Sequence, residues 1–178
     1  MLQTYINHLS QSTREFVVFT QAKIGVMTVI LYHKNELYLI MQFYSLEKDI
    51  SVFCVTASSF PEGVLAAHQK LHSYVSFNEN RNYFGISAPD KTGTIVYKSA
   101  AEEMEPSELS KHNLEPFVIK KGSYSYIDIR DFEKNIPAIK KAFDELITNP
   151  DIDPQGCCVE WYLKSNLVRC MIRLKDIN

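Results

Sequence analysis

A glutamate set among apolar and aromatic residues has the clearest chemical potential in this sequence. It is Glu160, in the run Val159-Glu-Trp-Tyr-Leu163. If this run is a strand, side chains alternate between its two faces, so Glu160 and Tyr162 share one face and Val159 and Trp161 share the other. A carboxylate removed from water is costly unless it is paired, hydrogen-bonded or protonated. We therefore expect the Glu160 face to line a binding groove, with Val159 and Trp161 lying under helices.

Tyrosines on neighbouring predicted strands extend this face. The same alternation places each of them opposite the apolar residues of its own strand. The predicted ligand contacts are Glu160, Tyr162, Tyr83, Tyr124 and Tyr126. An organic cation supplies the charge that a buried carboxylate lacks, and each tyrosine face adds about 0.5–2 kcal/mol of cation–π attraction. With a reactive neutral ligand, the same acid is suited to act as a general acid or base, because burial raises its pKa. The sequence leaves both roles open.

Two other groups with chemical potential favour plainer interpretations. Asp128 lies on the tyrosine side of its strand, and we predict an ordinary surface charge with Arg130 as its partner. His68 and His72 have the spacing of two metal ligands on a helix, but the glutamate of the zinc-protease motif does not follow His68. We expect no metal there. No glycine-rich phosphate loop or serine elbow occurs, so no cofactor is predicted.

An internal repeat predicts the elements that position these residues. Residues 54–75 align without a gap on residues 126–147, so that Phe60 matches Phe132 and Leu71 matches Phe143. Each copy begins with strand-like alternation and continues with a helical apolar stripe. Two strand-like runs follow each helix, at 83–87 and 94–101 in the first copy and at 157–163 and 167–174 in the second. A unit this small cannot bury its apolar face alone.

The predicted fold class is therefore α+β, with two tandem strand–helix–strand–strand repeats that form one domain. We assign residues 50–178 to this domain, with repeat one at 50–101 and repeat two at 117–174. The acidic stretch from Glu102 to Glu108 connects the repeats.

Residues 1–49 lie outside the repeat and form a predicted N-terminal extension. Leu2, Ile6 and Leu9 have the spacing of a short amphipathic helix. Val26–His33 and Glu36–Tyr44 are predicted strands of a hairpin with a tight Lys34-Asn35 turn. Both strands are rich in apolar residues, so the hairpin extends the sheet, covers a pocket or forms a homodimer contact. The sequence does not choose among these roles.

Composition limits the class of protein. The chain has 178 residues, is 46% hydrophobic and carries a net charge of -2, which excludes binding to nucleic acid through bulk positive charge. No apolar run reaches the roughly 20 residues of a membrane span, and the N-terminus lacks a secretory pattern. The four cysteines have no metal-site spacing and lie in apolar strand-like runs, typical of reduced thiols. We expect a soluble, cytoplasmic protein.

Several of these features together resemble one known family. They are the tandem units, the runs Tyr83-Phe-Gly-Ile-Ser87 and Lys121-Gly-Ser-Tyr124, and the strand that contains Glu160. The set is similar to the GyrI-like small-molecule-binding family, which also supplies the effector-binding domain of many AraC-type and MerR-type transcription regulators. The resemblance covers about residues 50–174, and it implies two units side by side with a ligand groove between them. It also implies that Glu160 is the family's ligand-facing acid.

The family's known activities give three alternatives. Its regulators bind lipophilic cations through a buried acid and surrounding aromatic residues. Some members are stand-alone binders, one type binds gyrase, and another branch hydrolyses strained cyclopropane-containing natural products. No helix-turn-helix can be placed before Ile50, so we expect the stand-alone form without direct DNA binding. The favoured function is binding of a small aromatic or cationic molecule, as a sensor or sequestering protein; the alternatives are a hydrolase using Glu160 and a protein-partner binder such as a gyrase modulator.

Overall fold

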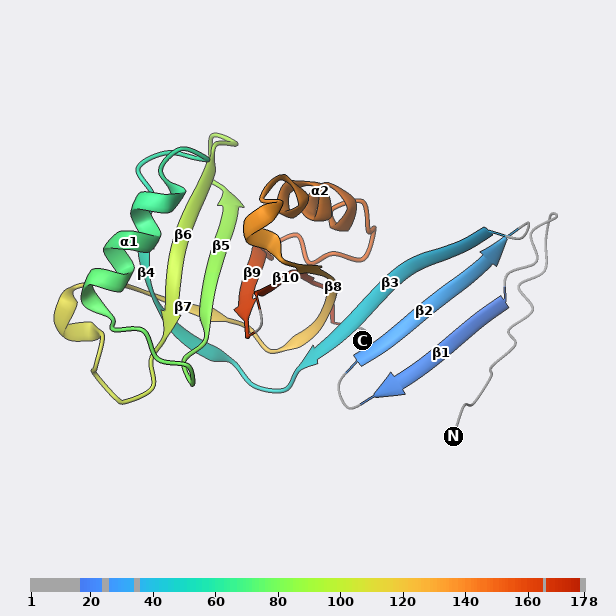
Figure 1. Ribbon diagram of the computed structural model, residues 1–178, viewed down its shortest axis with the longest axis horizontal. Helices are drawn as coiled ribbons and strands as arrows, with labels where there is room; N and C mark the ends of the chain where they lie inside the picture. The colour runs from blue at the N-terminus through green and yellow to red at the C-terminus, as the bar shows by residue number, and fades with distance from the viewer. Residues whose placement is uncertain (1–16, 24–25, 34–35, 165, 177–178) are drawn as a thin grey trace.

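The computed structural model describes residues 17–23, 26–33, 36–164 and 166–176. Within them the chain forms strands, two α-helices and two 3-10 turns (Figure 1). In chain order these are β1 (Val17–Lys23), β2 (Val26–His33), β3 (Glu36–Leu46), β4 (Ile50–Thr56), α1 (Val64–Tyr74), β5 (Tyr83–Pro89), β6 (Ile95–Glu102), η1 (Ser110–His112), β7 (Glu115–Ile119), β8 (Gly122–Arg130), η2 (Phe132–Lys134), α2 (Pro137–Leu146), β9 (Cys158–Leu163) and β10 (Leu167–Arg173).

All described strands join one antiparallel sheet, so the chain has an α+β fold. The strand order is β1-β2-β3-β8-β10-β9-β5-β6-β4-β7. Residues 50–102 form strand, helix, strand and strand, and residues 122–173 follow the same order. Strands β5 and β9 pair at the junction of these two stretches. Strands β1 and β7 were not predicted.

Both helices cover the same face of the sheet (Figure 1). In α1, Ala67 and Leu71 lie one turn apart and pack with Val55 and Ala101. In α2, Pro137 occupies the first helical position, where its missing N–H costs nothing. Apolar side chains of α2 pack on β8 and β10. None of the described helices is long and apolar enough to cross a membrane.

The opposite face of the sheet forms a second core by curling onto itself. Leu46 of β3 and Ile119 of β7 belong to one buried cluster, although six strands separate β3 from β7 in the sheet order. Strands in a flat sheet are about 4.8 Å apart, so these residues can share a cluster only if the sheet curls. Val159 is buried in this second core and Trp161 packs against it. The prediction that Val159 and Trp161 lie under the helices was therefore wrong.

The N-terminal strands continue the sheet beyond β8. Residues Gln42–Leu46 of β3 pair with residues Gly122–Tyr126 of β8, and β2 and β1 follow outward. In Figure 1 the three strands extend away from the helix-covered part of the sheet. The backbone thus shows the predicted hairpin extending the sheet. The predicted helix at Leu2, Ile6 and Leu9 and the Lys34-Asn35 turn lie outside the described residues.

Candidate functional site

Glu160 lies on the helix-covered face, where the cores of the two helices meet. It pairs across the sheet with Cys170 of β10 and Gly85 of β5. Its neighbour Tyr162 packs against both the α1 cluster and the α2 cluster. Only 9% of the Glu160 surface is exposed, so the carboxyl group has left bulk water. Alternation along β9 places Glu160 and Tyr162 on the same face of the sheet, as predicted.

Two tyrosine hydroxyls bind the same carboxylate oxygen. The Tyr162 hydroxyl donates to Oε2 of Glu160 at 2.5 Å, and the Tyr97 hydroxyl donates to it at 3.1 Å. The two hydroxyl oxygens are themselves 3.3 Å apart. Burial raises the pKa of Glu160 above its ordinary value, and the two hydrogen bonds partly oppose that shift. Burial and the nearby carboxylate raise the pKa of both tyrosines, so both remain protonated donors.

Sequence reasoning missed Tyr97. It lies in β6, two strands away from β9, and its register partner Ser87 in turn pairs with Cys158 on the Glu160 face. Sorting the alternation of the run 94–101 would have placed Tyr97 and Ser99 on one face. Neither face of that run is uniformly polar, so the pattern alone carried little signal. The pairing of β5 with β9 is what brings Tyr97 to the acid.

His68 belongs to this hydrogen-bonded group. Its Nε2 is 2.9 Å from the Tyr97 hydroxyl, and its Nδ1 is 2.8 Å from the hydroxyl of the fully buried Ser99. Burial, with a smaller contribution from His72, lowers the pKa of His68 to about 4, so the imidazole is neutral at pH 7. The chain of contacts runs from Ser99 through His68 and Tyr97 to Glu160 and Tyr162. We call these five residues the acid network.

His72 lies apart from the acid network, although it shares helix α1 with His68. Its ring packs against Tyr83 with centroids 5.1 Å apart. Within the described part of the chain, no group of His, Cys, Asp and Glu side chains is arranged to hold a metal ion. Both nitrogens of His68 already have hydroxyl partners.

Gly85 provides the space that the acid network occupies. A Cβ atom at this position would lie 2.1 Å from the Tyr97 hydroxyl and 2.7 Å from Oε2 of Glu160. Both distances are well below van der Waals contact, so a larger residue would displace one of the two groups. The Gly85 of the predicted Tyr83–Ser87 strand therefore has a steric role at the site.

Two phenylalanines flank the tyrosines of the acid network. Phe60, in the loop before α1, stacks on Tyr97 with ring centroids 5.9 Å apart and planes 18° apart. Phe132, in the turn before α2, contacts Tyr162 with centroids 5.4 Å apart. Phe60 is 45% exposed, so one side of this ring faces solvent. The two tyrosines that contact the carboxyl group thus each have a phenylalanine neighbour. One comes from the loop before α1 and the other from the turn before α2.

The other predicted contacts are placed elsewhere. Tyr83 is on the Glu160 face, but its hydroxyl accepts a hydrogen bond from the Asn78 backbone N–H at 3.0 Å and does not reach the acid. Tyr124 and Tyr126 belong to the core of the opposite face. The register shows why, since Tyr126 pairs with Met171, which pairs with Val159. The expectation that these two tyrosines share a face with Glu160 was wrong.

Asp128 also lies on that opposite face, with a partner other than the one predicted. Arg169 donates two hydrogen bonds to it, from Nε at 2.8 Å and from Nη2 at 2.9 Å. The guanidinium lies over the Tyr126 ring at 4.0 Å and over the Tyr44 ring at 5.1 Å. Asp128 is thus a paired charge, as expected, but with Arg169 across the sheet in place of Arg130.

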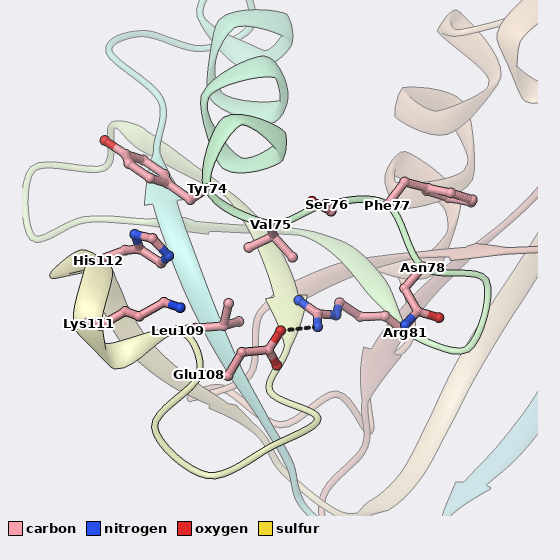
Figure 2. Close-up of a pocket in the computed structure, with 10 residues that line it drawn as sticks. All are labelled: Tyr74, Val75, Ser76, Phe77, Asn78, Arg81, Glu108, Leu109, Lys111 and His112. Carbon is pink, nitrogen blue, oxygen red and sulfur yellow. Dashed lines mark hydrogen bonds and ion pairs between the residues drawn. The ribbon is translucent and has the colours of Figure 1, made fainter.

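Surface cavities occur at a distance from the acid network. One of about 330 Å³ lies at the C-terminal end of α1, where Arg81 pairs with Glu108 below Tyr74, Lys111 and His112 (Figure 2). Another of about 270 Å³ is lined by Ile86, Phe117 and Cys157 on the curled face. No member of the acid network lines either cavity.

Comparison with known proteins establishes the fold. No family model and no curated protein match the sequence. Among solved structures, an integron cassette protein from the mobile metagenome of Vibrio cholerae is 12% identical, with a TM-score of 0.54 over 76% of this chain and 95% of that one. The protein SAV2435, solved with bound tetraphenylphosphonium, is 10% identical, with a TM-score of 0.58 over 76% of this chain and 93% of that one. The fold is therefore one that also occurs in a ligand-bound protein.

Proposed function

We propose that this protein binds a small aromatic or cationic organic molecule at the acid network, as a stand-alone sensor or sequestering protein. One observation carries the proposal: Glu160 is nearly buried, yet it makes no ion pair with any described residue. Two hydroxyls orient the carboxylate but do not balance its charge. A bound cation supplies the missing charge.

The aromatic surroundings favour a flat or lipophilic cation. Tyr97 and Tyr162 contact the carboxylate through their hydroxyls, and Phe60 and Phe132 pack against these two rings. Such rings attract a desolvated organic cation through their quadrupoles. Tetraphenylphosphonium, bound in the SAV2435 structure, has this chemistry, and so do the ligands implied by the resemblance to the GyrI-like family. In the proposed site, the half-exposed Phe60 is the part of the aromatic surroundings that solvent reaches most.

The proposal is tested with two ions of one shape and opposite charge. Tetraphenylphosphonium and tetraphenylborate are titrated by calorimetry against the wild type, E160Q and E145Q. Glu145 is exposed on α2, so E145Q repeats the charge change away from the site. We expect E160Q alone to weaken cation binding by 1.5–3 kcal/mol, about the contribution of a charge-assisted contact. It should not weaken binding of the anion. Equal cation affinities in wild type and E160Q would remove Glu160 from the proposed site.

The raised pKa of Glu160 favours a second candidate function, a hydrolase that acts on reactive small molecules. A carboxyl group whose pKa is raised by burial is suited to general acid catalysis. The two candidates differ in what E160Q changes. In a hydrolase, substrate still binds and turnover collapses; in a binding protein, no turnover is found and affinity falls.

We further infer that the halves 50–101 and 117–174 are tandem repeats forming one ligand-binding domain, to which residues 1–49 are an extension. Reading outward from the β5–β9 pair, each half contributes its second strand, its third strand and then its first strand. Phe60 and Phe132, which match in the gapless alignment, each flank one tyrosine of the acid network. The inference would be supported by a crystal structure in which one twofold rotation superposes the helix and the strands of one half on those of the other. It would be contradicted if no single rotation superposed the helices and the strands together.

A further inference from the structure

Ser99 is a buried polar residue and His68 a partly buried one, and direct ligand contact is not required of either. They lie behind Tyr97 as seen from the acid, and the side-chain hydrogen bonds described for them lie within the acid network. Ser99 is fully buried on β6, and His68 is on α1 above it. Buried polar side chains rigidify a site only when each donor has an acceptor. The directions of these hydrogen bonds therefore bear on how many donors Glu160 has.

The donor count fixes one arrangement when Glu160 is ionised. A carboxylate only accepts, so Tyr97 and Tyr162 both donate to it. The single proton of Tyr97 is then used, and the contact with His68 must be a donation from Nε2–H to the Tyr97 oxygen. The Nδ1 atom then has a free lone pair, which accepts from the Ser99 hydroxyl. With the other tautomer Tyr97 would have to donate to His68, and Glu160 would lose one of its two donors.

We infer that His68 is a positioning residue for Glu160: its Nε2–H commits the Tyr97 proton to the carboxylate, and Ser99 holds the imidazole in the tautomer that does so. This arrangement favours the ionised form of Glu160. On the proposed function, on which this consequence rests, binding of a cation is coupled to loss of the Glu160 proton to solvent. The affinity for a cation then rises with pH until Glu160 is fully ionised.

The other titratable groups near the acid do not compete for this role. From β9 and β10, the Cys158 and Cys170 thiols lie near Glu160, and burial raises the pKa of each thiol, so both are neutral at pH 7. From α1, His72 acts on His68 through space. The side chains of α2 packed in its cluster are apolar. His68 is thus the group that sets the direction of the Tyr97 hydrogen bond.

The first experiment needs no ligand and therefore does not depend on the proposed function. Imidazole ¹⁵N shifts report the His68 tautomer, and the ¹³C shift of the Glu160 carboxyl reports its titration. We expect the Nε2–H tautomer in wild type. Relative to wild type, H68F should raise the Glu160 midpoint, whereas H68Q should nearly restore it because its side-chain amide still donates to Tyr97. H72Q, on the same helix, is the control and should leave the midpoint unchanged.

A variant of Ser99 provides a second route if H68F does not fold. S99A removes the donor to Nδ1 and should shift the Glu160 midpoint in the same direction as H68F, by less. The inference is overturned by an Nδ1–H tautomer in wild type, or by a Glu160 midpoint that neither H68F nor S99A changes. Rescue by H68Q separates a hydrogen-bonding role from a purely structural one, because glutamine does not reproduce the shape of the imidazole ring.

The second experiment measures the coupling itself. Tetraphenylphosphonium is titrated in buffers of different ionisation enthalpy, which gives the protons released for each cation bound. We expect release in wild type near the Glu160 midpoint, and an affinity about tenfold lower in H68F at pH 7, the effect of one lost charge-assisted hydrogen bond. H68Q should bind nearly as wild type. Binding without proton release at that midpoint overturns the coupling. If wild type does not bind the cation, the proposed function fails while the ligand-free titrations still decide the role of His68.

Discussion

Glu160 and Arg169 are charged residues on neighbouring cross-strand pairs of β9 and β10, but on opposite faces of the sheet. Arg169 pairs with Trp161, and Cys170 pairs with Glu160. The guanidinium has a carboxylate partner in Asp128 and lies over two tyrosine rings. The carboxylate of Glu160 has two tyrosine hydroxyls and, among the described residues, no cation.

The difference is between a charge with an ion-pair partner and an acid without one among the described residues. A buried ion that is fully paired contributes to a fixed arrangement, and removing its partner is costly. A buried ion without a counterion has a perturbed pKa and an uncompensated charge, and both are typical of functional sites. On this comparison the Arg169 side of the sheet carries a paired charge, and the Glu160 side carries the acid that is unpaired within the described part of the chain, at which we propose that a ligand binds. Four measurements test this contrast.

The largest effect is expected from G85A. The added methyl group would overlap the Tyr97 hydroxyl and Oε2 of Glu160, so both hydrogen bonds must be broken or displaced. Overpacking and loss of the two hydrogen bonds together should cost about 2–4 kcal/mol of unfolding free energy, measured by urea denaturation. Cation binding should be lost in the same variant.

Tyr97 supplies the control for this substitution. Y97F removes the hydroxyl that the methyl group would overlap, so the double variant G85A/Y97F should be more stable than the sum of the two single effects predicts. Strict additivity, or a stable G85A protein with unchanged Glu160 titration, would contradict the steric role of Gly85.

The next effect concerns acid stability and His68. The pKa of His68 is lowered in the folded protein to about 4 from an ordinary value of 6.5. The neutral imidazole therefore contributes stability that is present above pH 6.5 and is lost as the pH falls from 6.5 to 4. H68Q has no such titration, so the loss of stability between pH 7 and pH 4 should shrink by up to about 3 kcal/mol. Thermal melts across this range measure the change, with H72Q as the comparison.

Removing the partner of Arg169 should have a smaller effect. D128N leaves the guanidinium between its tyrosines without a counterion. Because the side chains of Arg169 and Asp128 are 13% and 29% exposed, solvent offsets part of the penalty, and we expect a loss of about 1–2 kcal/mol. D144N breaks the exposed pair with Lys140 on α2 and should cost less than about 0.5 kcal/mol. Equal losses in the two variants would show that the Arg169 pair has no special structural role.

The last of the four measurements concerns E160Q, for which we expect a smaller effect on stability than for D128N. Burial raises the pKa of Glu160, so its contribution to folding is present at low pH and is lost as the pH rises through its folded-state value. The neutral glutamine avoids that loss, and E160Q should be as stable as wild type at low pH and more stable, by about 1 kcal/mol, at alkaline pH. An E160Q protein that is less stable at high pH would instead indicate that the charge supports the fold.

Local patterns predicted much of the fold and part of the candidate site. Periodicity placed both helices and the strands around them, and alternation placed Glu160 beside Tyr162. The failures share one physical cause. Alternation sorts the faces of a single strand, but it does not say what covers each face. We expected apolar Val159 and Trp161 to face the helices, whereas the sheet curls and buries that face against itself.

Long-range strand pairing determines where the remaining residues lie relative to the acid. Tyr97 and His68 reach the acid only because β5 joins β6 to β9 and because α1 lies over β6. Tyr124 and Tyr126 lie away from the acid because the pairing of β9 with β10, and of β10 with β8, places them on the other face of the sheet. No spacing within a single segment contains these relations. The spacing of His68 and His72 even points to metal chemistry, which their different neighbours do not support.

The position of Trp161 gives the molecule a built-in optical reporter. It is the single tryptophan of the chain, it follows Glu160 directly, and its indole N–H donates to Asn82 at 3.1 Å. Its ring contacts Tyr44 and Phe84 on the curled face, with centroids 5.8 Å and 5.7 Å away. A ligand beside Glu160 is thus separated from the indole by the backbone of β9. A change in emission on binding would therefore report the ligand through the strand or through its charge, without direct contact with the fluorophore.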